Sequence, residues 1–100
     1  MMSKTPIDLK GVKEGETDMQ LLRIALIAEL DAINFYEQCA ASTKDTAMKK
    51  IFLDVAGEEK THIGEFQSLL LIRDREQEKE LIHGDKEVDD LTGEGSEEED

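Results

Sequence analysis

The chain has 100 residues and a formal net charge of −13, from 25 acidic against 12 basic residues. This charge repels phosphate backbones and anionic membrane surfaces and attracts cations, so we expect neither a nucleic-acid partner nor a membrane partner. Only 38% of the residues are hydrophobic and four are aromatic, so one chain alone can build only a thin core. We therefore expect one small domain that associates with further copies of itself.

The single cysteine, Cys39, cannot form an intrachain disulfide, and we expect it to be a small packed residue. The first twenty residues hold no apolar run long enough for a signal peptide. The longest apolar stretch, residues 69–72, is far too short to span a bilayer. A cytoplasmic protein is expected.

Residues 1–16 predict a loosely ordered N-terminal arm, because Pro6 and two glycines stand among alternating charges. From Thr17 or Asp18, either of which can cap a helix, apolar side chains recur at steps of three and four. This period predicts one helix over residues 17–42. Its inward stripe comprises Met19, Leu22, Ala25, Glu29, Ala32, Ile33, Tyr36 and Ala40.

Residues 42–45 have the composition of a tight turn, in which Asp45 or Thr43 can cap a second helix. This helix is predicted over residues 46–74. Two long helices joined by a tight turn form an antiparallel hairpin, and a lone hairpin leaves half of each apolar stripe in water. We expect a second copy to cover these stripes, which gives a ferritin-like four-helix bundle. The second stripe comprises Met48, Ile51, Phe52, Val55, Glu59, His62, Ile63, Phe66, Leu69 and Leu70.

The stretch after the second helix is highly charged, and the apolar residues that follow, Leu81 and Ile82, come just before Gly84. Because glycine commonly ends helices, a short third helix is predicted that stops there. The all-α helical domain, a hairpin plus this short helix, then spans residues 17–90. Residues 91–100 predict a disordered acidic tail.

Polar side chains interrupt the apolar stripe of the second helix at Glu59 and His62. Residues three apart in a helix are rotated by about 60° and separated by about 4.5 Å along the axis, so these two side chains can converge on one point. A carboxylate and an imidazole suit iron, manganese or zinc. Bundle proteins with two metals repeatedly use such a Glu-x-x-His pair together with a Glu from a neighbouring helix.

Glu29 interrupts the stripe of the first helix at a matching depth, because it lies about 15 residues before Lys44 and Glu59 lies about 15 residues after it. An unpaired ionised carboxylate in an apolar environment costs several kcal/mol, so a cation among these three side chains best explains them. One chain supplies half of a two-metal site. The homodimer that covers the apolar stripes would also complete this site.

The same residues allow simpler interpretations. Glu59 and His62 can be an exposed helical pair whose spacing arises by chance. Tyr36, seven residues after Glu29, can be ordinary core or can form a hydrogen bond to a ligand carboxylate.

A second Glu-x-x-His occurs at Glu80 and His83. No turn signal precedes Arg73, so Glu80 should lie more than about 20 Å along the helix from His62. We interpret this pair as a solvated helix end and exclude it from the site.

The motifs resemble those of the encapsulated ferritins, ferritin-like proteins found inside or fused to encapsulin nanocompartments. The resemblance covers roughly residues 5–90. It is carried by ELDAINFY at residues 29–36, by EEKTH at residues 58–62, and by the 30-residue interval between Glu29 and Glu59.

This resemblance implies an antiparallel dimer around a di-iron ferroxidase centre, with the dimers joined into a decameric ring. It implies Glu29 and Glu59 as carboxylate ligands of iron, His62 as a neutral imidazole ligand, and Tyr36 as the catalytic tyrosine beside them. Manganese, zinc or calcium would be substitutes for iron. The protein would oxidise Fe(II) to Fe(III) in the cytoplasm, within an encapsulin shell that stores the product, either as cargo or fused to the shell protein.

Three features depart from the family pattern. Phe35 stands where the family usually has Trp, which removes an N–H donor. Ala28 and Asp31 stand where some members have glutamates of an outer metal site. Residues 91–96 are only a faint, acidic counterpart of the apolar peptide that docks free cargo members on the shell.

Two other functions are compatible with these residues. A rubrerythrin-like peroxidase or a manganese catalase uses a similar half-site, although no CxxC motif of a rubredoxin module is present. A non-catalytic helical assembly module would use Glu29 and His62 only to set the register across a dimer seam.

Overall fold

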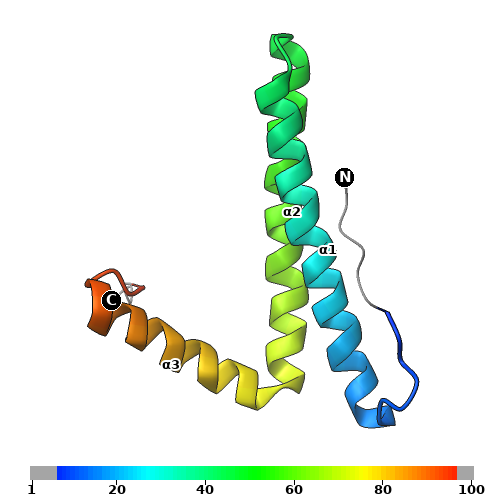
Figure 1. Ribbon diagram of the computed structural model, residues 1–100, viewed down its shortest axis with the longest axis vertical. Helices are drawn as coiled ribbons and strands as arrows, with labels where there is room; N and C mark the ends of the chain where they lie inside the picture. Colours follow the sequence, from blue (N-terminus) through cyan, green and yellow to red (C-terminus); the bar gives the residue numbers. More distant parts are fainter. Residues whose placement is uncertain (1–6, 97–100) are drawn as a thin grey trace. The chain divides into compact units, whose positions relative to one another are not determined.

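The computed structural model describes residues 7–96, within which three α-helices and no strand are present. The helices are α1 (Glu14–Ser42), α2 (Thr46–Arg73) and α3 (Arg75–Thr92) (Figure 1). The prediction of an all-α fold is thus confirmed. None of the helices in this part of the chain is both long and apolar enough to cross a membrane. The chain divides into two compact units, of which the first ends at Leu70 and the second begins at Leu71.

Helix α1 begins at Glu14, earlier than the predicted start at residue 17. Lys13 precedes it in an extended conformation, and no side chain caps the helix at that point. Glu14 and Glu16 place negative charge in the first turn, where it interacts favourably with the positive end of the helix dipole. Thr17 lies inside the helix and donates its hydroxyl hydrogen to the carbonyl oxygen of Lys13 at 3.3 Å. Acidic residues in the first turn therefore favour an earlier start than a cap at Thr17 would give.

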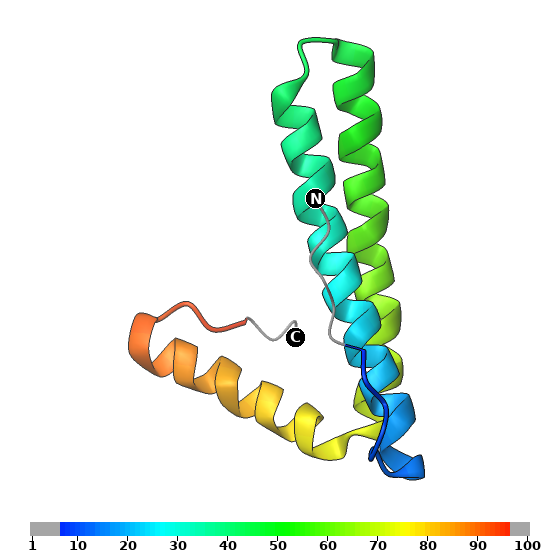
Figure 2. The ribbon, with the colours of Figure 1, turned by 45° about the vertical axis from the view of Figure 1, so that its right-hand side comes forward.

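The turn between α1 and α2 is held by two side-chain oxygens. Thr43 Oγ1 accepts a hydrogen bond from the amide of Asp45 at 3.1 Å, and Asp45 Oδ1 accepts one from the amide of Met48 at 3.0 Å. The second contact satisfies an amide that the first turn of a helix otherwise leaves unpaired. Asp45 is therefore the cap of α2, one of the two predicted candidates. From this turn α1 and α2 run antiparallel and side by side, as Figure 2 shows.

The core of the hairpin consists mainly of small side chains. The buried apolar residues are Ala32, Ile33, Ala40, Ala56 and Leu70. Alanines at these positions let the two helix backbones approach closely but remove little apolar surface from water. Much larger side chains of the hairpin remain exposed, namely Leu21, Ile27, Leu30, Met48, Ile51, Leu53 and Leu69. A single hairpin therefore leaves these seven large apolar side chains without cover.

Helix α3 is longer than predicted. Asp74 caps it by accepting a hydrogen bond from the amide of Gln77 at 3.0 Å. The prediction that Gly84 ends the helix is wrong, because Gly84 lies within α3 and the helix ends before Gly93, whose φ of 75° is left-handed. A glycine inside a helix costs only about 1 kcal/mol relative to alanine, so a single glycine does not by itself end a helix.

The segment after α3 folds back on its own helix. The amide of Gly95 donates to Asp89 Oδ1 at 3.2 Å, and the amide of Ser96 donates to Asp85 Oδ1 at 2.7 Å. The end of the predicted disordered tail, residues 97–100, lies outside the described residues.

Candidate metal centre

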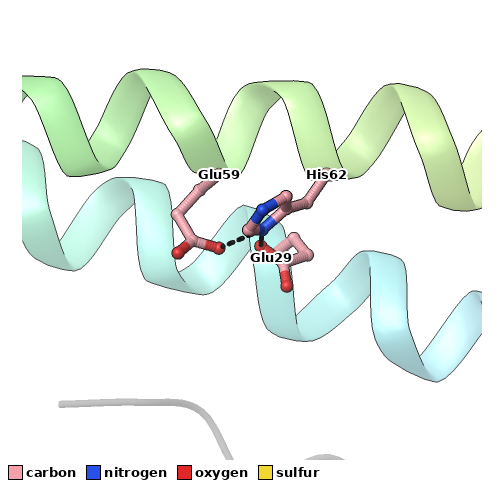
Figure 3. A group of neighbouring side chains, drawn as sticks. All are labelled: Glu29, Glu59 and His62. Atoms are coloured by element: carbon pink, nitrogen blue, oxygen red, sulfur yellow. Dashed lines mark ion pairs between the residues drawn. The ribbon is translucent and has the colours of Figure 1, made fainter.

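Glu29 of α1 and the pair Glu59 and His62 of α2 meet where the two helices of the hairpin face each other (Figure 3). Oε2 of Glu29 and Oε2 of Glu59 each lie 3.4 Å from Nδ1 of His62. One ligand atom from each residue lies within 4.8 Å of the others. The structure therefore brings together the three residues that were selected from the sequence as ligands.

The register of the hairpin explains this meeting. Glu29 and Glu59 stand at equal distances in sequence from Lys44 in the turn. Because each helix advances by about 1.5 Å per residue, equal distances from the turn place the two carboxylates at one level. His62 follows Glu59 by three residues and so projects from the same side of α2.

The burial of the three side chains is uneven. Glu29 and Glu59 are 19% and 18% exposed, whereas His62 is 44% exposed. The two carboxylates therefore lie against the hairpin, and the imidazole lies at its open face.

Glu29 Oε2 is buried and has no hydrogen-bond partner. Its distance of 3.4 Å from His62 Nδ1 qualifies as an ion pair, but this distance is longer than that of an ordinary N–H···O hydrogen bond, so the contact does not satisfy the oxygen. A buried carboxylate oxygen without a partner is costly. A divalent cation bound by two carboxylates and one imidazole would remove this cost, and that donor set suits iron, manganese or zinc. The residues present thus fit a metal ion.

A groove of about 460 Å³ leads to this cluster. Its lining comprises Glu29, His62, Glu65, Phe66 and Leu69. Glu65 was not among the residues selected from the sequence, although the equal steps from Glu59 to His62 and from His62 to Glu65 could have indicated it. The lining thus combines three ionisable side chains with two apolar ones.

Tyr36 is held by aromatic neighbours. Its ring centroid lies 5.2 Å from that of Phe35 in an edge-to-face arrangement and 6.4 Å from that of Phe52 in a stacked arrangement. Such pairs contribute about 0.5–1.5 kcal/mol beyond area burial. These contacts support the interpretation of Tyr36 as core, and a role at the ligands stays a prediction.

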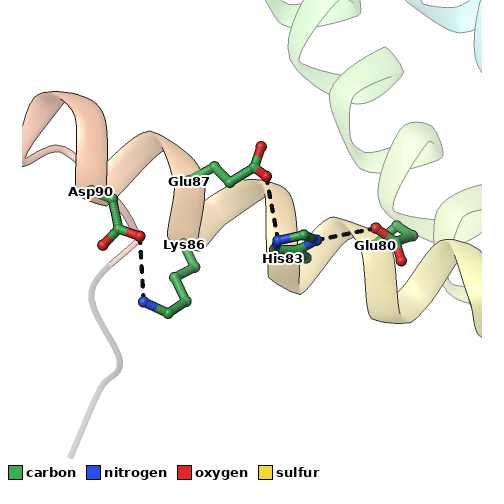
Figure 4. A network of polar contacts seen from close by, with 5 residues as sticks. All are labelled: Glu80, His83, Lys86, Glu87 and Asp90. Atoms are coloured by element: carbon green, nitrogen blue, oxygen red, sulfur yellow. Dashed lines mark hydrogen bonds and ion pairs between the residues drawn. The ribbon is translucent and has the colours of Figure 1, made fainter.

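The second Glu-x-x-His motif lies on α3, in the other unit (Figure 4). Nδ1 of His83 lies 3.3 Å from Glu80 Oε2, and Nε2 lies 3.3 Å from Glu87 Oε1. The two carboxylates approach opposite nitrogens of one ring, so they do not converge on a common point. All three side chains are more than half exposed. With the neighbouring pair of Lys86 and Asp90, they form a solvated row of charges along α3.

Comparisons with known proteins identify relatives of this chain. The EncFtn-like family model matches residues 7–83. A curated protein of Pyrococcus furiosus, the "Ferritin-like-encapsulin shell fusion protein", is 59% identical over 75 residues, which are 75% of this chain and 22% of that protein. The chain thus spans about a fifth of the length of this relative.

A comparison with solved structures also finds an encapsulated ferritin. The crystal structure of the encapsulated ferritin domain from Pyrococcus furiosus matches with a TM-score of 0.83 and 49% sequence identity, covering 96% of this chain and all of that one. The family model spans most of the chain, including both helices that carry the ligand cluster. The chain therefore belongs to the EncFtn-like family of encapsulated ferritins.

Proposed function

We propose that this protein is a ferroxidase, which oxidises Fe(II) to Fe(III) at a di-iron centre formed between two copies of the chain. The observation that carries this proposal is the convergence of Glu29, Glu59 and His62 within 4.8 Å. The buried oxygen of Glu29 without a hydrogen-bond partner supports it, because a cation supplies the missing partner.

A second copy is needed for two reasons that do not depend on each other. One chain offers two carboxylates and one imidazole, which is half of the ligand set that a two-metal helical bundle uses. The hairpin also leaves large apolar side chains exposed, including Ile27, Leu30 and Ile51, and covering them is favourable. An antiparallel four-helix dimer would meet both needs. Further association into a decameric ring belongs to the same proposal.

The chemistry follows from the ligands. Two ferrous ions, the substrates, each give one electron to dioxygen, which takes two protons from water and leaves as hydrogen peroxide. Glu29 and Glu59 favour the product, because carboxylates bind Fe(III) more tightly than Fe(II). The imidazole of His62 holds the ion at the open face. The net charge of −13 concentrates Fe(II) around the protein.

The proposed place of action is an encapsulin compartment in the cytoplasm. The relative in Pyrococcus furiosus is named as a fusion to an encapsulin shell. The two grooves of the hairpin are open to solvent, so a surrounding shell would store the Fe(III). The chain would reach that shell as cargo or as a fused domain.

The test is the initial rate of Fe(II) oxidation, followed by ferric absorbance with purified protein. Glu29→Ala, Glu59→Ala and His62→Ala should each lower the rate on the order of 100-fold. Asp54→Ala is the matched control, because Asp54 is an exposed carboxylate of α2 outside the cluster, and it should leave the rate unchanged. Unchanged rates in all three ligand variants would refute the proposal.

Two further measurements separate the other functions. Faster turnover of hydrogen peroxide than of Fe(II), with manganese or iron bound, would indicate a peroxidase or a catalase. A stable assembly that binds no metal after expression with iron would indicate a structural module.

A further inference from the structure

The groove beside the metal centre contains one carboxylate that the proposed reaction does not use. Glu65 lines it together with Glu29, His62, Phe66 and Leu69. Glu65 is exposed, whereas Oε2 of Glu29 is buried. The groove therefore joins an exposed carboxylate to a buried one.

The spacing along α2 places Glu65 on the opposite side of His62 from Glu59. Both glutamates are three residues from His62, one before it and one after it, and so each is rotated by about 60° from it in opposite directions. Glu59 turns toward Glu29, and their Oε2 atoms share Nδ1 of His62. Glu65 lies outside that cluster and lines the groove.

The apolar walls of the groove make this carboxylate important. An ion that leaves water for a site lined by Phe66 and Leu69 loses hydration, which is costly without an opposite charge nearby. Glu65 is the only charged side chain of the lining besides those of the proposed ligands. A carboxylate at this position lowers the cost of the last step toward Glu29.

We propose that Glu65 is a capture residue, which takes hydrated Fe(II) at the exposed part of the groove and passes it to Glu29 and His62. This inference rests on the proposed function, since it concerns how that substrate reaches the centre. Glu65 then acts before oxidation and holds no ion in the loaded centre. Its loss should slow loading and leave the final amount of bound metal unchanged.

The test is the rate of metal uptake without oxygen, by stopped-flow mixing of the assembled protein with Co(II), whose visible absorption reports binding to protein ligands. Glu65→Gln should lower the uptake rate about tenfold, a typical size for local electrostatic steering, with the same final Co(II) per chain. Glu65→Asp keeps the charge and should restore most of the rate. Solution mass confirms that each variant has the wild-type assembly.

Glu58→Gln is the matched control. Glu58 is an exposed glutamate four residues before His62, and it does not line the groove. Its substitution by glutamine removes the same charge as Glu65→Gln. It should change the uptake rate less than about twofold, a general effect of net charge.

Three results would overturn the inference: an unchanged rate in Glu65→Gln, an equal loss in Glu58→Gln, or a reduced final amount of Co(II), which would make Glu65 a ligand. These results differ from a failure of the proposed function. If wild-type protein takes up no Co(II), or if Glu59→Ala takes it up normally, the metal centre itself is refuted. If uptake depends on Glu59 and not on Glu65, only the capture role is refuted.

Discussion

Oε2 of Glu29 and Nδ1 of His62 lie 3.4 Å apart across the two helices of the hairpin, yet the carboxylate oxygen is buried without a hydrogen bond. A contact of this kind does little for the stability of the folded chain. It does hold two ligand atoms at a separation that a cation can bridge. The pair therefore places a cost on the metal-free protein that metal binding removes.

This cost leads to the first prediction, that Glu29→Gln separates stability from binding. The change removes a buried negative charge and keeps the shape, so the metal-free variant should melt at the same temperature as wild type or higher. Metal should no longer raise its melting temperature. For wild type, free metal at about 100 times its dissociation constant should stabilise the fold by about 2.7 kcal/mol.

Thermal melting with and without Co(II), in the absence of oxygen, measures both effects. Glu58→Gln should keep the metal-induced rise, since Glu58 lies outside the cluster. A metal-free Glu29→Gln protein that is clearly less stable than wild type would show that Glu29 has a structural role instead.

The helices of the hairpin and the ligand cluster were predictable from the sequence for the same reason. A 3.6-residue period fixes which side chains share a face, and a tight turn such as Thr43 to Asp45 fixes the register, so Glu29, Glu59 and His62 had to meet. The groove was less predictable, because its walls depend on how Phe66 and Leu69 pack. The three-residue step from His62 could have indicated Glu65, but the step alone does not show that a groove lies there.

The extent of α3 was mispredicted at Gly84 because sequence alone does not separate two uses of glycine. Gly84 sits inside α3, whereas Gly93 has a φ of 75° and ends it. Each glycine is followed by an acidic residue, Asp85 or Glu94, so their surroundings look alike in the sequence. Only the backbone conformation distinguishes them.

The second prediction uses this difference between the two glycines. A Cβ added at Gly84 meets nothing within 4 Å, so Gly84→Ala should stabilise α3 by about 0.5–1 kcal/mol. Gly93→Ala should destabilise its C-terminal end, since alanine is strained at positive φ. Hydrogen exchange of the amides of α3 in the full chain measures both. Faster exchange in Gly84→Ala would contradict the first expectation.

The third prediction concerns pH and the segment after α3. Hydrogen bonds from the hydroxyl and the amide of Ser96 hold the pKa of Asp85 below its ordinary value of 3.8. A lowered pKa means that this contact contributes fully above pH 3.8 and is lost as the pH falls through the lower folded value. The amide signal of Ser96, followed by NMR, should therefore shift with a midpoint below 3.8.

Asp85→Asn is the control for this titration. It keeps an oxygen acceptor for Ser96 but removes the ionisable group, so the amide signal should show no transition at that midpoint. A midpoint above 3.8 in the unchanged protein would contradict the folded-back arrangement of Ser96 on Asp85.

The fourth prediction addresses whether two chains share one centre. Wild-type chains and Glu59→Ala chains are co-expressed in known ratios, so that mixed assemblies form. If each centre needs Glu29, Glu59 and His62 from both chains, only pairs of two wild-type chains oxidise Fe(II), and activity falls as the square of the wild-type fraction. If a centre belongs to one chain, activity falls in proportion to that fraction.

At equal amounts of the two chains, the activities expected in the two cases differ by about twofold, which initial rates resolve easily. Mixtures of wild-type chains with Asp54→Ala chains are the control and should show no loss of activity. Linear dependence would leave the ligand cluster in place but refute the shared centre. A metal ion bound at the half-exposed His62 would then complete its coordination sphere with water.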